Sequence, residues 1–275
     1  MPAPARSYST EAIILRRRNL GEADSIFTLF SRTEGKFDAV ARGVRKAKSH
    51  MRGHLEPLTR VQVHVARGRS LDVLTQAETA AAHRRLKDDL DRLNMGLYCA
   101  ELVDRFTIDR VEQRALYDLL ADALEAMEAG ASAVAVRYFE FHLLAITGYE
   151  PQVAACAACH AHLPEEETLF SAPAGGLVCR ACRHRAESGR LLGIRAIKVL
   201  RYARTATIQE FDGLRLDAAL AHDLQAALAG LVHQVIDREL NTVRYMDALG
   251  RADRAPALTA NHVQSASPEP ETPEP

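Results

Sequence analysis

"LTRVQVHVARGRSLDVLTQAET", residues 58–79, carries the clearest strand pattern in this chain. Valines alternate with glutamine and histidine through residues 61–65, and period-two alternation is typical of a strand with one buried face. Residues 67–70 then separate this strand from another at 71–79, and Gly68 can take the positive φ of a short hairpin turn. The stretch therefore predicts a β-hairpin on the wall of a small β-structure.

Three further strand-like runs precede the hairpin, at residues 11–18, 25–32 and 36–44. With hairpin strands at 58–67 and 71–79, they give five short strands with one longer connection between the third and the fourth. This arrangement fits a small closed barrel such as an OB-fold, although the periodicity also permits an SH3-like barrel. We expect a five-stranded OB-fold barrel over residues 1–80.

After about residue 83 the sequence becomes rich in Ala and Leu at helical spacing. The helical runs are 84–107, 113–128, 133–147, 194–204 and 216–240. They predict an α-helical domain in two parts, residues 81–150 and 191–249, with a cysteine-containing segment inserted at 151–190. Residues 250–275 form an acidic Pro-rich tail that we expect to be disordered. The predicted fold class is α+β and multidomain.

The formal net charge of −1 conceals an uneven distribution along the chain. Residues 1–85 contain 16 Lys and Arg against 8 Asp and Glu, whereas the rest contains 19 against 28. The helical stretch 86–150 is acidic and makes a poor DNA surface. Because charge is segregated in this way, we expect the barrel to meet a polyanion.

The positive charge of the barrel gathers in "ARGVRKAKSHMRGHLEP", residues 41–57, at the end of the first strand and beside the hairpin. Loops between strands 1–2 and 4–5 usually frame the nucleic-acid groove of an OB-fold. The candidate DNA-binding residues are Arg16, Arg17, Arg18, Arg42, Arg45, Lys46, Lys48, Arg52, Arg67 and Arg69. Ordinary solvated surface charge is the alternative interpretation of these cations.

Aromatic side chains are scarce in the predicted barrel. Tyr8, Phe27, Phe30 and Phe37 are the aromatic residues of this domain, and some of them must fill its interior. We therefore expect phosphate contacts to dominate, with little recognition of bases and a steep dependence on salt.

Four of the five cysteines lie in "CAACHAHLPEEETLFSAPAGGLVCRAC", residues 156–182. Cys156, Cys159, Cys179 and Cys182 form two Cys-x-x-Cys pairs at the spacing typical of a tetrahedral zinc site. Four thiolates would close the coordination sphere, so we expect one structural Zn²⁺ without a position for substrate. The intervening loop is polar, and we expect the ion to order it.

Other interpretations of the cysteines are weaker. Two disulfides would require an oxidising compartment, and a thioredoxin-type motif would require a βαβ unit. His160, His162 and His184 could replace a cysteine as ligand, whereas Cys99 fits a buried small apolar residue. Basic residues crowd the second pair and would either contact phosphate or favour the thiolates; they are Arg180, Arg183, Arg185 and Arg190.

The sequence contains no recognisable catalytic motif, and we predict that the protein is not an enzyme. "RGVRKAKS", residues 42–49, is similar to a P-loop ending, but Arg42 and Ala47 occupy the two required glycine positions. A zinc hydrolase would need an open metal position, which four cysteines do not leave. No apolar run approaches the roughly 18 residues of a membrane span, and the first residues lack a signal-peptide core. We expect a cytoplasmic, nucleoid-associated protein without membrane or small-molecule partners.

Two parts of the sequence together resemble a known family. The barrel sequence at residues 11–49 and 53–78 is similar to the N-terminal domain of the recombination mediator RecO. The cysteine segment matches the family's "CxxC…FS…GGxxCxxC" pattern, with Phe170-Ser171 and Gly175-Gly176 between the two cysteine pairs. The order of barrel, helices, cysteine segment and closing helices also agrees, over roughly residues 8–249.

The resemblance implies a DNA repair and homologous recombination mediator of the RecF pathway. Such a protein binds single- and double-stranded DNA, anneals complementary strands and forms a complex with RecR. It also binds the acidic C-terminal tail of single-strand-binding protein through its helical domain, and so helps load RecA onto coated strands. The alternative from a different class is a zinc-ribbon transcription or RNA-binding adaptor, which would show a base-sequence preference.

Overall fold

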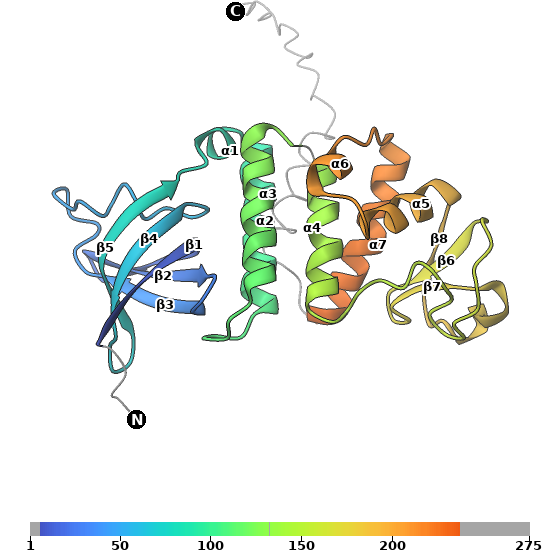
Figure 1. Cartoon of the computed structure of the whole chain (residues 1–275), viewed down its shortest axis with the longest axis horizontal. Coiled ribbons are helices and arrows are strands. Elements are labelled where there is room, and N and C mark those ends of the chain that lie inside the picture. The colour runs from blue at the N-terminus through green and yellow to red at the C-terminus, as the bar shows by residue number, and fades with distance from the viewer. Residues whose placement is uncertain (1–5, 132, 237–275) are drawn as a thin grey trace, which may run out of the picture.

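The computed structural model describes residues 6–131 and 133–236. A β-barrel and a small sheet that carries the cysteines lie at opposite ends of an elongated molecule, with helices between them (Figure 1). The predicted tail at 250–275 and the last part of the predicted helix at 216–240 lie outside the described residues.

The barrel is built from the five strands expected of it. They are β1 (Ser7–Leu20), β2 (Asp24–Ser31), β3 (Gly35–Ala41), β4 (Arg60–Ala66) and β5 (Asp72–Ala81). Their order around the barrel is β1-β2-β3-β5-β4, closed by antiparallel pairing of β1 with β4 and containing one parallel pair, β3 with β5. This Greek-key order confirms the predicted OB-fold.

Alternation along the strands fills the barrel as the sequence indicates. Val61, Val63 and Val65 point inward and are at most 1% exposed, together with Phe27 and Phe37. Each of these buried side chains contributes roughly 1.5–3 kcal/mol by leaving water. The barrel therefore has a complete apolar core of its own.

The opposite side of β1 and β2 packs against the helices. Ile13, Leu15 and Phe30 are buried in the core of the helical part and not in that of the barrel. The ring of Phe30 lies 6.0 Å from the ring of Tyr117, and the Tyr117 hydroxyl donates to the Glu11 carboxylate at 2.8 Å. Part of the outer wall of the barrel is thus covered by protein.

The helices next to the barrel are α1 (Arg84–Asp88), α2 (Leu90–Phe106), α3 (Arg114–Ala129) and α4 (Ala133–Ile146). One continuous helix over 84–107 was predicted, and this is wrong at Asp89. Asp89 is extended, and its carboxylate accepts from the backbone N–H groups of Asp91 and Arg92. An N-cap of this kind starts a new helix with a change of direction.

The cysteine segment contains regular structure that the sequence did not indicate. Its elements are β6 (Thr168–Ser171), β7 (Gly176–Val178), the 3₁₀ helix η1 (Arg180–Arg185) and β8 (Arg190–Leu192). The three strands form one antiparallel sheet in the order β7-β6-β8. Phe170, Leu177 and Leu192 are buried in the same core as the helices. The expectation that an ion alone orders this segment is therefore incomplete.

The chain closes with α5 (Ile194–Ala203), α6 (Ile208–Asp212) and α7 (Ala218–Ile236). The short helix α6 escaped the sequence analysis, although Thr207 and Glu210 form a capping box at its start. Leu220, Leu224 and Leu228 of α7 are buried, so the regularly spaced leucines of this helix pack in the core.

Candidate metal centre and nucleic-acid surface

The four cysteines of the predicted metal site converge at the end of the molecule away from the barrel. Cys156 and Cys159 lie between α4 and β6, Cys179 follows β7, and Cys182 lies in η1. All four Sγ atoms are within 4.8 Å of one another, and those of Cys159 and Cys179 are 3.8 Å apart. Zn–S bonds of about 2.3 Å in a tetrahedron require S–S separations of about 3.8 Å. The sulfurs are therefore spaced to share one ion.

Backbone turns hold each cysteine pair in place. The His160 N–H donates to the Cys156 carbonyl at 2.8 Å, and the Cys182 N–H donates to the Cys179 carbonyl at 3.0 Å. The Cys179 N–H also donates to the Cys156 Sγ at 3.3 Å, which joins the two turns. Main-chain hydrogen bonds thus help to set the positions of the sulfurs.

The ionisation of the cysteines fits a cation site. Burial opposes ionisation of Cys156, but backbone N–H groups of Cys179, Cys159 and Ala158 outweigh it and lower the pKa of Cys156 to about 6. Hydrogen bonds with Cys159 and Cys179 raise the pKa of Cys182 to about 12. The cluster therefore resists full ionisation on its own, and a bound divalent cation would favour the remaining thiolates.

Neighbouring residues do not complete or replace this site. Within residues 6–131 and 133–236, the four cysteines are the one group of His, Cys, Asp or Glu side chains placed to share an ion. His160, His162 and His184 are exposed and lie outside the group. Cys99 is fully buried in α2, as expected of a small core residue.

Acidic residues of α2 and α3 neutralise the near side of the barrel. The pairs are Arg16 with Asp104 at 3.4 Å, Lys36 with Asp104 at 3.2 Å, Arg32 with Asp118 at 3.0 Å and Arg60 with Glu125 at 3.1 Å. The acidic character of residues 86–150 therefore has a structural explanation. These carboxylates pair with barrel cations on the side that faces the helices, and not with those on the basic loop.

Several predicted DNA-binding residues contact other parts of the barrel. Arg18 forms an ion pair with Asp38. The Arg17 Nε donates to the Ser25 hydroxyl at 3.3 Å, and the Arg17 guanidinium lies over the Phe27 ring. In the same way, Arg67 pairs with Glu34 at 3.6 Å and lies 4.7 Å from the ring centre of Tyr8. Arg16, Arg17, Arg18 and Arg67 are thus held by protein partners.

The remaining predicted cations are exposed and gather on two loops. Arg42, Arg45, Lys46, Lys48 and Arg52 lie on residues 42–59, hereafter the basic loop, and Arg69 lies in the β4–β5 hairpin. Arg45 donates to the Gly21 carbonyl at 3.0 Å. The other five have no ion-pair partner among the residues that the structure describes.

The basic loop is well anchored although it contains no helix or strand. Val44 and Leu55 are buried in the barrel core near its two ends. Between them, successive turns are closed by backbone hydrogen bonds from Lys46 to Gly43 and from Ser49 to Lys46, each at 3.0 Å. The loop therefore displays its cations from a fixed base.

Sequence reasoning missed Arg110, which lies in the connection between α2 and α3. Its guanidinium forms an ion pair with Asp72, donates to the Tyr8 hydroxyl at 2.8 Å and covers the Phe37 ring at 4.6 Å. Asp72 also accepts from the Gly68 N–H at 3.1 Å. Arg110 thus links the helical part to the β4–β5 hairpin.

The surroundings of the Arg110–Asp72 pair show that the α2–α3 connection packs closely on the barrel. Burial alone would raise the pKa of Asp72, but the Gly68 N–H and the Arg110 guanidinium outweigh it and lower that pKa. Gly35 has φ +66°, and a Cβ placed there would meet the Val111 carbonyl at 2.1 Å. The α2–α3 connection therefore lies directly on the barrel. No local sequence signal could have indicated a contact between positions so far apart in the chain.

The geometry defines a class of protein: an OB-fold barrel with a cation-rich loop, joined to a helical region that carries a cluster of four cysteines able to hold a metal ion. None of the helices in the described part of the chain is long and apolar enough to cross a membrane. The family model described as "Recombination protein O N terminal" matches residues 5–83, and "Recombination protein O C terminal" matches residues 87–244. The chain belongs to this recombination protein O family of DNA repair proteins.

Curated relatives agree with this assignment. The chain is 35% identical over 243 residues to "DNA repair protein RecO" of Roseiflexus sp. (strain RS-1), covering 88% of this chain and 86% of the relative. It is 32% identical to the protein of that name from Dehalococcoides mccartyi, covering 90% and 97%. The match to that of Desulforudis audaxviator is also 32%, covering 89% and 98%. The family resemblance inferred from the sequence is confirmed.

Proposed function

We propose that this protein is a non-enzymatic mediator of homologous recombination in the RecF pathway. It binds single- and double-stranded DNA through the barrel, anneals complementary strands and acts with RecR to help load RecA onto strands coated by single-strand-binding protein. The observation that carries this proposal is a set of exposed cations on the basic loop that have no ion-pair partner within residues 6–131 and 133–236, namely Arg42, Lys46, Lys48 and Arg52.

Counterion release is the physical basis of the proposed binding. Each phosphate that a Lys or Arg neutralises frees a condensed cation, so affinity falls as salt concentration rises. Cations already paired with carboxylates release little, because their charge is satisfied before DNA arrives. The loop cations therefore contribute more than Arg16 or Arg18, which have carboxylate partners.

The four cysteines would hold one Zn²⁺ with a structural role. A site with four cysteine ligands leaves no position for water or substrate, and thiolates are ligands that Zn²⁺ prefers in proteins. The ion would fix the two cysteine turns to each other. It takes part in no reaction in this proposal.

A pocket beside Arg137 supports binding of the acidic tail of single-strand-binding protein to the helical domain. The pocket has a volume of about 130 Å³ and is lined by apolar side chains that include Met95 of α2, Val136 of α4 and Leu216, which precedes α7. Arg137 pairs with the fully buried Glu140 at 3.1 Å, yet its Nη1 is buried without a hydrogen-bond partner among the residues that the structure describes. An acidic peptide with an apolar side chain would satisfy both features of this pocket.

Strand annealing with and without single-strand-binding protein tests the proposal. The test variant combines Arg42→Ala, Lys46→Ala, Lys48→Ala and Arg52→Ala. A control variant with the same loss of charge combines Arg195→Ala, Lys198→Ala, Arg204→Ala and Arg215→Ala, all exposed and on the helical side. We expect the test variant to lose annealing and the control to keep it.

The salt dependence of oligonucleotide affinity gives a second readout. Loss of four phosphate contacts should reduce the slope of log K against log salt by about 3 for single strands. Normal annealing by the test variant would exclude the basic loop as the DNA site. A preference for one base sequence, without annealing, would instead favour the adaptor alternative.

A further inference from the structure

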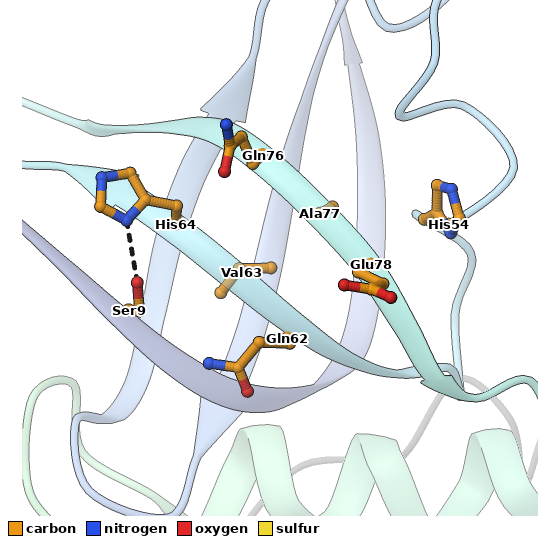
Figure 2. Close-up of a pocket in the computed structure, with 8 residues that line it drawn as sticks. All are labelled: Ser9, His54, Gln62, Val63, His64, Gln76, Ala77 and Glu78. Carbon is orange, nitrogen blue, oxygen red and sulfur yellow. Dashed lines mark hydrogen bonds between the residues drawn. The ribbon is translucent and has the colours of Figure 1, made fainter.

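A polar groove crosses the outer face of β1, β4 and β5 (Figure 2). Its volume is about 490 Å³, and its polar lining residues are Ser9, His54, Gln62, His64, Gln76 and Glu78. Only Glu78 among them is an acidic or strongly basic residue. The groove therefore lacks the Lys and Arg side chains that are common on the exposed loops of this barrel.

Strand register explains why these side chains gather. Ser9 pairs with His64 and His64 with Gln76, so one row of polar side chains crosses all three strands. Gln62 pairs with Glu78 in the next row. Because side chains two apart on a strand share a face, both rows point outward together. Figure 2 shows them on the same side of the sheet.

A bulge in β5 shapes the groove. The pairing register shifts between His64 and Val65, so that Thr75 has no direct partner, and its hydroxyl donates to the His64 carbonyl at 3.0 Å. Bulges bend a strand and increase its local twist, and they are common next to binding sites. The twist hollows the sheet where the two polar rows lie.

This face is open, in contrast to the face that an OB-fold usually offers to nucleic acid. The usual face lies over strands 2 and 3. Here Phe30 of β2 packs on Tyr117, and Lys36 of β3 pairs with Asp104 of α2. Gln62, Gln76 and Glu78 remain exposed.

The groove lies between the two groups of exposed cations, those of the basic loop and Arg69 of the hairpin. The β4–β5 hairpin with Arg69 continues from the end of the groove at His64 and Gln76. At the other end, His54 of the basic loop accepts from the Thr79 N–H at 3.2 Å and is also hydrogen bonded to the Thr79 hydroxyl at 2.8 Å. A strand whose phosphates contact both loops would therefore cross the groove.

The chemistry of the lining suits the edge of a base and not a phosphate. Side-chain amides present a donor and an acceptor together, the arrangement that pairs with base edges. The Glu78 carboxylate would repel a phosphate but can accept from an exocyclic amino group. His64 is held by a 2.8 Å hydrogen bond between its Nδ1 and the Ser9 hydroxyl, so its Nε2 is the ring nitrogen that could serve a ligand as donor or acceptor.

We propose that this groove binds an unpaired nucleobase of a DNA strand whose phosphates contact the basic loop and the hairpin. The proposal rests on the DNA-binding function proposed above. It revises the expectation of little base recognition, which considered only aromatic stacking. Gln62 and Gln76 contact the base edge, and Glu78 accepts from the amino group of cytosine, adenine or guanine.

Equilibrium binding to fluorescent 20-residue oligonucleotides tests the groove. The probes are oligo-dC, oligo-dT and an abasic strand of the same length, which keeps every phosphate. Wild type should bind oligo-dC about tenfold more tightly than the abasic strand, as a few hydrogen bonds allow. The Gln62→Ala/Gln76→Ala variant should bind both equally, with an unchanged salt slope. Gln209→Ala, an exposed glutamine on α6, is the matched control.

Glu78→Gln provides a second variant that separates base from backbone contact. A carboxylate beside a base amino group predicts weaker oligo-dC binding and little change for oligo-dT. Stronger binding of every probe, the abasic strand included, would mean that phosphate passes there and would overturn the inference.

The outcome for the groove can be told apart from that for the loop. Equal affinity of wild type for oligo-dC and the abasic strand, or wild-type behaviour of Gln62→Ala/Gln76→Ala, overturns the groove assignment. The DNA-binding function would still stand if the basic-loop variant lost affinity in the same assay. No binding of any probe by wild type would overturn both.

Discussion

The two ends of this molecule differ in whether their functional side chains converge on one another or face the solvent. At the cysteine end, four thiols converge within 4.8 Å, and one ion bound by all four would leave no position for an outside ligand. At the barrel end, Val44 and Leu55 hold the backbone of the basic loop in place, and the cations of the loop have no ion-pair partner among the described residues. The most specific motif of the chain is therefore proposed to serve stability, and the least specific stretch carries the proposed DNA binding.

This contrast predicts that substitutions at the two ends separate stability from DNA binding. Substitutions at the cysteine end should lower the free energy of unfolding but leave the DNA affinity of the folded molecules unchanged. Substitutions in the basic loop should lower DNA affinity but leave the free energy of unfolding nearly unchanged. The following predictions run from the largest expected change in unfolding free energy to the smallest.

Cys156→Ser should cost on the order of 4 kcal/mol, because losing a metal site belongs to the large destabilising mechanisms. Thermal unfolding followed by circular dichroism measures the loss of stability, and mass spectrometry measures the loss of the ion. His184→Ala, an exposed neighbour outside the cluster, should keep the ion and the melting temperature. A stable Cys156→Ser variant that has lost only DNA binding would contradict the contrast.

Arg110→Ala should cost about 2 kcal/mol, because the Asp72 side chain, only 9% exposed in the wild-type fold, would lose its ion-pair partner. Urea unfolding compares it with Arg114→Ala, whose exposed pair with Glu112 contributes little. The Arg110–Asp72 pair joins the helical part to the β4–β5 hairpin, which carries Arg69. Its loss should therefore lower both the free energy of unfolding and the affinity for DNA.

The same pair should make stability depend on pH in acid. The pKa of Asp72 is lower in the folded state than in the unfolded one. Its contribution is therefore fully present above the ordinary carboxyl pKa and is lost as pH falls through the lower folded value. Urea unfolding between pH 7 and pH 3 should show a smaller acid loss for Arg110→Ala than for wild type. An identical loss in both proteins would mean that the pair contributes nothing.

Tyr117→Phe should cost about 1 kcal/mol, the usual value of one hydrogen bond, here the bond to Glu11. The ring contact with Phe30 would remain. Tyr149→Phe, at an exposed position, serves as control in the same unfolding assay. A loss of unfolding free energy well above about 1 kcal/mol would show that the contacts between barrel and helices are cooperative.

Replacing Arg42, Lys46, Lys48 and Arg52 with Ala should change the free energy of unfolding by less than about 0.5 kcal/mol, as expected of exposed sites. DNA affinity in low salt should nevertheless fall strongly. If this variant unfolded easily, the loop would be part of the core structure, and the contrast between the two ends would fail.

Local patterns in the sequence allowed much of this architecture to be predicted. Alternation at Val61, Val63 and Val65 indicated the barrel wall, and cysteine spacing indicated that the four cysteines would converge. The break at Asp89 was missed because a capping residue resembles any polar residue on a helix surface. The small sheet around Phe170 was missed because its strands have only three or four residues.

The candidate DNA surface was only partly predictable. Charge alone could not tell Arg18, paired with Asp38, from Lys48, which has no ion-pair partner in the described part of the chain. That distinction depends on which carboxylates the fold brings near. The polar groove was invisible for a similar reason, since Ser9, His64 and Gln76 become neighbours only through strand pairing.

The charge separation lies between the barrel and the helices beside it, and the cysteine segment at the far end takes no part in it (Figure 1). Residues 1–85 carry a formal excess of eight positive charges and residues 86–150 an excess of seven negative ones, whereas residues 151–190 carry four charges of each sign. In the field of a nucleic acid such a dipole experiences a torque as well as an attraction. The protein would therefore approach a nucleic acid barrel first, with the acidic helices turned away from the phosphates.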